Sequence, residues 1–127
     1  ADGIHFPEKH IFDADTQKLK ENFILGQSVH SLEMATKAEL LYIDYLIVGT
    51  LFPSKSHPQG RVSGTKIIED ISGKLSVPLI GIGGISSQNC RKVIDSGASG
   101  VAVIGAISEA VDPRLESQII LENISVS

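Results

Sequence analysis

Two glycine-bearing segments, residues 79–86 and 100–107, each close an apolar run in a way that suits anion binding. A glycine pair in the first segment lets the backbone approach a ligand closely, and the second opens a short helix whose N–H groups and dipole point outward. Glycine at the end of a strand often does no more than permit a tight turn. Because two such turns occur in successive units, the pattern favours a phosphate site. The residues predicted to bind phosphate are Gly83, Gly84, Ile104, Gly105 and Ala106.

The segment from Gly49 to Gly64 is long for a connection between a strand and a helix and shows no periodic apolar pattern. Such loops are often functional, although a solvated loop that only turns the chain has a similar composition. Here two cations could neutralise phosphate, two hydroxyls could donate to it, and an imidazole could do either or transfer a proton near neutral pH. The candidates for this flap are Ser54, Lys55, Ser56, His57 and Arg61.

Short apolar runs alternate with segments of helical spacing, and this order would bring the loops together. Ser31 is a predicted N-cap of one helix, and Ser86 or Ser87 of another helix that Gly97 ends. The expected strands and following helices are 4–6 with 13–20, 23–26 with 31–41, 45–48 with 65–74, and then the two glycine-bearing runs.

The apolar runs are rich in Ile, Val and Leu without polar alternation, which is typical of strands buried on both faces of a parallel sheet. A TIM (β/α)8 barrel takes about 250 residues, so this chain is either a complete doubly wound open sheet or the last five units of a barrel. Phosphate turns after the last two strands favour the partial barrel. We expect one domain over residues 1–127, truncated at its N-terminus, whose open edges pair with the missing barrel half or with another copy as a homo-oligomer.

Composition narrows the kinds of partner. The chain has 127 residues and a net charge of −4, and its 11 Lys and Arg residues are scattered. Because nucleic-acid binding depends on clustered basic residues, we expect no nucleic-acid partner. No apolar run is long enough to cross a membrane, and the single Cys offers no disulfide. These features predict a cytoplasmic protein with a local site for a small anion.

The remaining histidines and the cysteine are interpreted as structural. Cys90 lies beside Val93 on an apolar helix face and is expected to be a buried apolar side chain. His30 is expected to cap or pack a turn, and His5 to have a structural role. No cluster of His, Cys, Asp and Glu has the spacing of metal ligands, so no metal site is predicted.

The motifs around these loops resemble those of the thiamine-phosphate synthase and TenI family, over nearly the whole chain. Glycine turns alone would suit many phosphate-binding barrels, whereas Ser-Val-His-Ser-Leu-Glu and Phe-Pro-Ser-Lys are more selective. The resemblance is carried by Ala1-Asp2-Gly3-Ile4-His5, by Gly26-Gln27-Ser28-Val29-His30-Ser31-Leu32-Glu33, by Gly49-Thr50-Leu51-Phe52-Pro53-Ser54-Lys55, and by residues 78–85 and 97–104.

This resemblance implies a TIM barrel of thiamin biosynthesis that binds a thiazole phosphate at the glycine turns. Synthase members of the family join that ligand to a pyrimidine pyrophosphate and release pyrophosphate with magnesium, whereas TenI-type members isomerise a thiazole carboxylate phosphate. Ser28 matches the synthase serine that contacts pyrophosphate, and Ser54 and Ser56 match hydroxyl positions of the flap.

Three positions depart from the family pattern. His10 stands where synthases carry a magnesium-binding Asp, so Mg²⁺ is expected as a cofactor only if the protein is nevertheless a synthase. His57 stands in place of the flap lysine of the synthases, with Lys55 two residues earlier. Thr50 stands in place of the tautomerase histidine, and because a hydroxyl cannot act as a base near neutral pH, His57 is the substitute candidate for proton transfer.

Our first hypothesis is therefore a TenI-like protein that binds a thiazole phosphate and isomerises it, active as the full-length protein and inactive as this fragment. The first alternative is a thiamine-phosphate synthase. The second, suggested by the replaced Asp, Lys and His, is a non-catalytic relative that binds a phosphorylated ligand or regulates in response to it.

Overall fold

A computed structural model of the chain describes residues 1–54 and 60–125. Five parallel strands form one sheet in the order β1-β2-β3-β4-β5, so each strand pairs with its neighbour in sequence. The strands are β1 (Gly3–Phe6), β2 (Ile24–Val29), β3 (Tyr45–Val48), β4 (Leu79–Ile82) and β5 (Gly100–Ala102).

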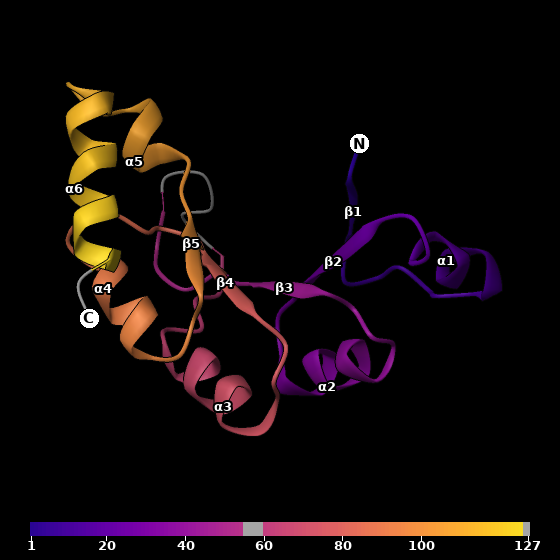
Figure 1. Cartoon of the computed structure of the whole chain (residues 1–127). Coiled ribbons are helices and arrows are strands. Elements are labelled where there is room, and N and C mark those ends of the chain that lie inside the picture. The colour runs from indigo at the N-terminus through magenta and orange to yellow at the C-terminus, as the bar shows by residue number, and fades with distance from the viewer. Residues whose placement is uncertain (55–59, 126–127) are drawn as a thin grey trace.

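The helices lie along one side of this sheet. Figure 1 shows α2, α3 and α4 following one another beside the strands, with α1 near the β1 end and α5 and α6 near the β5 end. A doubly wound sheet reverses its strand order and carries helices on both sides, whereas sequential order keeps successive crossovers on one side, as in a barrel. The partial TIM barrel is therefore confirmed. The helices are α1 (Ala14–Leu19), α2 (Leu32–Leu40), α3 (Lys66–Lys74), α4 (Cys90–Asp95), α5 (Gly105–Ser108) and α6 (Pro113–Ser125).

The apolar core lies between the sheet and these helices. Leu25, Leu46 and Leu79 come from the three central strands, and they pack in one cluster with Ile68 and Ile71 of α3. Burial of each such side chain contributes about 1.5–3 kcal/mol relative to exposure. Successive residues of a strand point to opposite faces, so their neighbours lie on the other side of the sheet, which we call the open face. The open face carries His5, Ser28, Tyr45, Ile47, Ile80 and Ile82.

One of the two predicted helix caps is confirmed. The Ser31 side chain accepts a hydrogen bond from the Met34 backbone N–H at 3.2 Å, at the start of α2. The prediction that Ser86 or Ser87 caps α4 is wrong for the N-cap position itself, because this helix begins at Cys90 and Asn89 precedes it, although Ser86 Oγ accepts the Gln88 N–H at 3.2 Å in the turn that leads into the helix. The intervening residues form a turn instead of helix, since the Ser86 N–H donates to Asn89 Oδ1 at 2.8 Å.

Asp44, the residue before β3, is hydrogen-bonded to β2 and to Lys20. Its Oδ2 accepts the Leu25 backbone N–H at 2.8 Å, and its Oδ1 accepts Lys20 Nζ at 3.0 Å. Partial burial raises the pKa of Asp44, but the Leu25 hydrogen bond and the Lys20 charge outweigh it and hold that pKa below its usual range. The folded state thus favours the ionised carboxylate.

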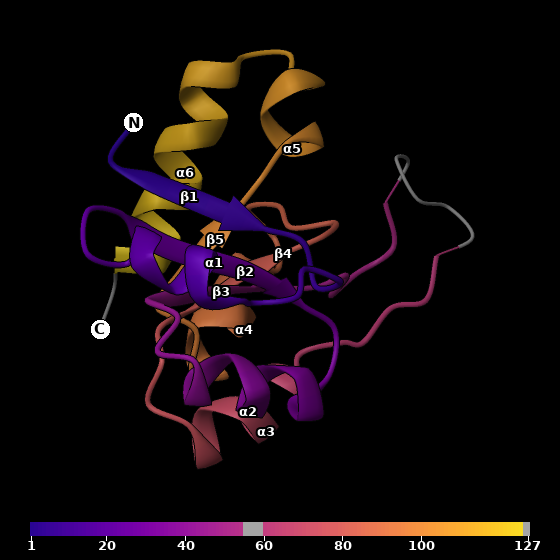
Figure 2. The same ribbon diagram turned by 90° about the vertical axis from the view of Figure 1, so that its right-hand side faces the viewer.

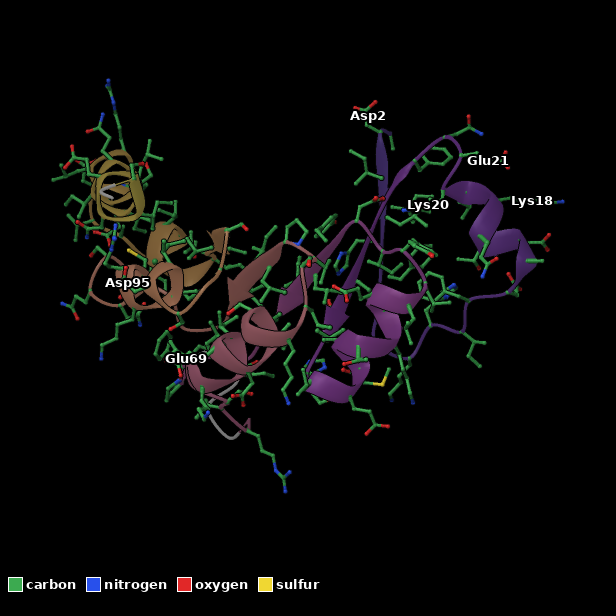
Figure 3. The ribbon with its side chains drawn as sticks, turned by 60° about the horizontal axis from the view of Figure 1, so that its bottom comes forward. Asp2, Lys18, Lys20, Glu21, Glu69 and Asp95 are labelled. Carbon is green, nitrogen blue, oxygen red and sulfur yellow. The ribbon has the colours of Figure 1, made fainter. Side chains whose placement is uncertain are left out.

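Charged side chains are distributed over the outside of the molecule. In Figure 3 the labelled Lys18, Lys20 and Glu21 lie at one end, while Glu69 on α3 and Asp95 on α4 lie at the other. Across the part of the chain that the structure describes, no helix is both long enough and apolar enough to span a membrane.

Candidate functional site

A cavity of ≈ 340 Å³ opens at the carboxyl ends of β4 and β5. Both glycine-bearing turns contribute to its wall, together with two residues of the long loop after β3. All five residues predicted to bind phosphate therefore lie around one space. The lining residues are Thr50, Ser54, Ile82, Gly83, Gly84, Ile85, Ser86, Ala102, Val103, Ile104, Gly105, Ala106 and Glu109.

The glycine pair after β4 is required by the packing of the loop as well as by backbone conformation. Gly83 and Gly84 have φ values of +105° and +62°, a region that side-chain-bearing residues rarely adopt. A Cβ on Gly83 would lie 2.5 Å from Thr50 Cγ2, and one on Gly84 would lie 2.4 Å from the Pro53 carbonyl oxygen. These glycines thus let residues 50–53 sit directly on the turn, with Thr50 and Ser54 of the same loop lining the cavity.

Backbone hydrogen bonds hold the described base of this loop. The Leu51 N–H donates to the Ile82 carbonyl at 3.0 Å and the Phe52 N–H to the Gly83 carbonyl at 3.0 Å. On the returning side, the Ser63 N–H donates to the Thr50 carbonyl at 2.8 Å. Figure 2 shows residues 49–54 and 60–64 extending away from the sheet, at the right of the view.

Unlike the predicted phosphate-binding residues, the residues predicted for the flap do not all lie at the cavity. Ser54 and Thr50 line the cavity, whereas Arg61 is exposed and does not line it. Ser28 does not line it either and makes other contacts, described below. Lys55, Ser56 and His57 lie outside the described residues, so their predicted roles stay predictions.

Asn89 is a positioning residue that the sequence interpretation did not select. Its Nδ2 donates to the Gly84 carbonyl at 3.0 Å, while its Oδ1 accepts the Ser86 N–H at 2.8 Å. Both partners line the cavity, so this amide fixes the shape of the glycine turn. An Asn five residues after a glycine pair and just before a helix was the available signal, because Asn side chains commonly bond to nearby backbone groups in turns.

A second polar group, also not predicted as a unit, lies on the open face of β1, β2 and β3. His5 Nε2 lies 2.8 Å from Ser28 Oγ, and His5 Nδ1 lies 3.2 Å from the Tyr45 hydroxyl oxygen. Gly26 lies between them in the register and makes this possible, since a Cβ there would be 2.0 Å from Tyr45 Cζ. Burial lowers the pKa of His5, which favours a neutral imidazole. His5 is therefore part of a polar cluster rather than only a structural residue.

Strand register gives the separation between this cluster and the cavity. Ser28 pairs with Ile47 and Ile47 with Ile80, and the cavity wall begins two residues further along β4, at Ile82. Two strand spacings and two residue rises amount to about 12 Å. Ser28 and the cavity both lie near the carboxyl ends of their strands, where barrel enzymes bind their ligands, whereas Tyr45 lies at the amino end of β3.

The residues near His10 do not fit a magnesium site. His10 Nε2 lies 3.2 Å from Thr16 Oγ1, and its ring stacks on Phe6 with centroids 4.3 Å apart. The nearby Glu8 Oε2 already accepts the His30 backbone N–H at 2.6 Å and lies 3.2 Å from His30 Nδ1. Mg²⁺ prefers several oxygen ligands in octahedral geometry. Among residues 1–54 and 60–125, no group of three or more His, Cys, Asp and Glu side chains is placed to hold a metal ion.

Comparison with known proteins identifies the family of the chain. A family model described as thiamine monophosphate synthase matches residues 1–107. The thiamine-phosphate synthase of Bacillus licheniformis is 36% identical over 129 residues, covering 100% of this chain and 58% of the relative. That of Pyrococcus furiosus is 37% identical over 114 residues, covering 90% and 55%. The solved structure of a thiamine phosphate pyrophosphorylase from Pyrococcus furiosus superposes with a TM-score of 0.84 at 33% identity, covering 98% of this chain and 59% of that chain. The chain thus spans a little over half the length of these relatives.

Proposed function

Because the chain belongs to the thiamine monophosphate synthase family, we propose that it supplies the phosphate-binding part of a thiamine-phosphate synthase. The full-length protein would join a thiazole phosphate to a pyrimidine pyrophosphate. In that transfer a bond forms between the thiazole and the carbon of the pyrimidine substrate that carries the pyrophosphate, the bond from that carbon to the pyrophosphate oxygen breaks, and its electron pair stays on the leaving oxygen.

The observation that carries this proposal is the single cavity built by both glycine turns. Gly83-Gly84 and Gly105-Ala106 approach it from neighbouring strands, so backbone N–H groups from two turns can converge on one phosphate. The hydroxyl side chains of Thr50 and Ser54 lie on its wall. A ligand anchored there would extend along the open face toward the His5–Ser28 pair, about 12 Å away by strand geometry.

The tautomerase hypothesis has less support than this alternative. The family model and the curated relatives carry the name of the synthase. Thr50, at the position of the tautomerase histidine, lines the cavity, and a hydroxyl is a poor base near neutral pH. The carboxylate phosphate of that reaction would therefore meet no imidazole from this position.

The test is pyrophosphate release by the full-length protein supplied with the pyrimidine pyrophosphate and the thiazole phosphate. We expect release that depends on both substrates, at a rate that excess inorganic phosphate reduces. The same preparation should not change the thiazole carboxylate phosphate faster than buffer does. Absence of pyrophosphate release, together with isomerisation of the carboxylate, would instead favour the tautomerase.

A further inference from the structure

Helix α6 connects the two glycine turns that build the cavity. It is separated from α5 by residues 109–112, and the Asp112 side chain accepts the Leu115 N–H at 3.1 Å in its first turn. Figure 1 shows α6 running from α5 at its start to α4 at its end, and it contacts both helices. Ile120, at 5% exposed, packs the middle of α6 into the apolar core. One helix thus reaches from the second glycine turn, at the start of α5, to the loop before α4.

Asn123, near the end of α6, bonds directly to that loop. Its Nδ2 donates to the Ser87 carbonyl at 2.8 Å. Because a carbonyl oxygen only accepts hydrogen bonds, this contact also defines which side of the amide faces the loop. Arg91 Nη1 on α4 donates to the Asn123 backbone carbonyl at 3.4 Å, which is a second and longer hydrogen bond between the same two segments. The end of α6 is therefore bonded on both sides of the start of α4.

The bond from Asn123 reaches a residue next to the cavity wall. Ser86, which precedes Ser87, lines the cavity, and its N–H donates to Asn89 Oδ1 at 2.8 Å. Asn89 Nδ2 donates in turn to the Gly84 carbonyl at 3.0 Å. Both bonds of Asn89 lie inside the turn and fix its shape. The bond from Asn123 joins the turn to another element, and so it fixes where the turn lies relative to α5.

We propose that Asn123 is a positioning residue for phosphate, through which α6 holds the Gly83–Gly84 turn at a set separation from the Gly105–Ala106 turn; this inference rests on the proposed phosphate-binding function of the cavity. Asn123 does not line the cavity, so it acts on a ligand only through the turn. Donors that are oriented before binding lose less conformational entropy when the anion arrives. A phosphate shared by two turns depends on their separation, whereas a phosphate held by one turn does not.

The first test measures the binding of inorganic phosphate to the full-length protein by calorimetry. We expect Asn123→Ala to raise the Kd for phosphate about two- to tenfold, which corresponds to the loss of one hydrogen bond. Asn123→Leu, of similar size but without a donor, should lose as much affinity. Ser117→Ala is the matched control on α6, because it removes a side-chain hydrogen bond at 2.9 Å to the Arg114 carbonyl, within the helix. It should leave the Kd unchanged.

The second test uses wild type and decides the question even where the variants do not fold. Coupling between two sites is reciprocal, so phosphate must favour the docked α6 as much as the docked α6 favours phosphate. We expect saturating phosphate to slow amide hydrogen exchange of residues 120–123 about two- to tenfold more than that of α2, which does not line the cavity. Equal slowing in α2 and α6 would be stabilisation of the whole protein and would count against the link.

The outcomes separate the role of Asn123 from the phosphate site itself. If wild type binds phosphate and both Asn123 variants bind it as tightly, the positioning role is wrong and the phosphate site stands. If Asn123→Ala loses affinity but Asn123→Leu does not, the side chain only fills space, and the proposal is overturned. If wild type binds no phosphate, the proposed site fails, and the role of Asn123 fails with it.

Discussion

His5 and Ser28 lie on neighbouring strands but two residues out of register, with Nε2 2.8 Å from Oγ. His5 pairs with Gly26, so its ring reaches forward along β2 to Ser28 and sideways over the glycine to Tyr45 on β3. Each of three neighbouring parallel strands thereby contributes one polar side chain to a cluster on the open face, with Ser28 near the carboxyl end of β2 and Tyr45 at the amino end of β3. The arrangement depends on the absence of a side chain at residue 26.

Gly26→Ala should disrupt this cluster and destabilise the fold. The added Cβ would lie 2.0 Å from Tyr45 Cζ, so the ring must move away from His5. Overpacking of this kind costs about 1–3 kcal/mol in the free energy of unfolding, measured by urea denaturation. Gly100→Ala on β5 is the matched control, because a Cβ there meets no heavy atom within 4 Å. Equal stability of the two variants would contradict the packing interpretation.

Gly105→Ala should weaken phosphate binding while leaving the fold intact. A Cβ at this position lies 3.6 Å from Glu109 Oε2, an ordinary contact, and it adds a methyl group at a residue that lines the cavity. We expect KM for the thiazole phosphate to rise about tenfold or more, measured by pyrophosphate release. Gly73→Ala on α3 is the control, because it meets no atom within 4 Å and should add about 0.5–1 kcal/mol of stability with no change in KM. An unchanged KM in Gly105→Ala would mean that phosphate binds elsewhere.

Asn89→Ala should loosen the glycine turn. The variant loses the hydrogen bonds to the Gly84 carbonyl and the Ser86 N–H, both beside the cavity. Each such bond contributes about 0.5–1.5 kcal/mol, so we expect the free energy of unfolding, measured by thermal or urea denaturation, to fall by about 1–2 kcal/mol. We also expect calorimetry to show weaker phosphate binding. Asn22→Ala, at an exposed position before β2, should change neither quantity. Full phosphate affinity in Asn89→Ala would show that the turn holds its shape unaided.

Asp44→Asn should remove a pH-dependent part of the stability. The pKa of Asp44 is lower in the folded chain than its ordinary value of 3.8, so its contribution is present above pH 3.8 and is lost as pH falls through the folded-state pKa. At neutral pH the variant should be about 1 kcal/mol less stable, a modest figure because the pair is partly exposed. The difference from wild type should vanish at the acid end of the titration, followed by urea denaturation at each pH. Asp2→Asn at the exposed start of β1 is the control, and a pH-independent difference would count against the linkage.

Much of this architecture was predictable because it depends on short-range patterns. Runs such as Tyr45–Val48 predicted buried parallel strands, Ser31 predicted the start of α2, and the glycine turns were expected at the ends of β4 and β5. The errors occurred where a side chain bonds across a turn. Asn89 organises residues 84–89 together with Ser86, because its amide reaches the Gly84 carbonyl and the Ser86 N–H at once while Ser86 Oγ accepts the Gln88 N–H.

The order of strands and helices, the glycine positions that permit positive φ, and the family motifs could all be read from the amino-acid sequence, since each depends on local residue chemistry. Which polar residues contact one another became apparent only from the folded arrangement of the strands. Ser28 lies 23 positions and Tyr45 lies 40 positions after His5 in the chain. The three residues come together because parallel pairing in one register places their strands side by side. The fold also packs the His10 ring on Phe6 and places its Nε2 beside the Thr16 hydroxyl. A magnesium site would need an oxygen ligand at this position, which an imidazole does not provide.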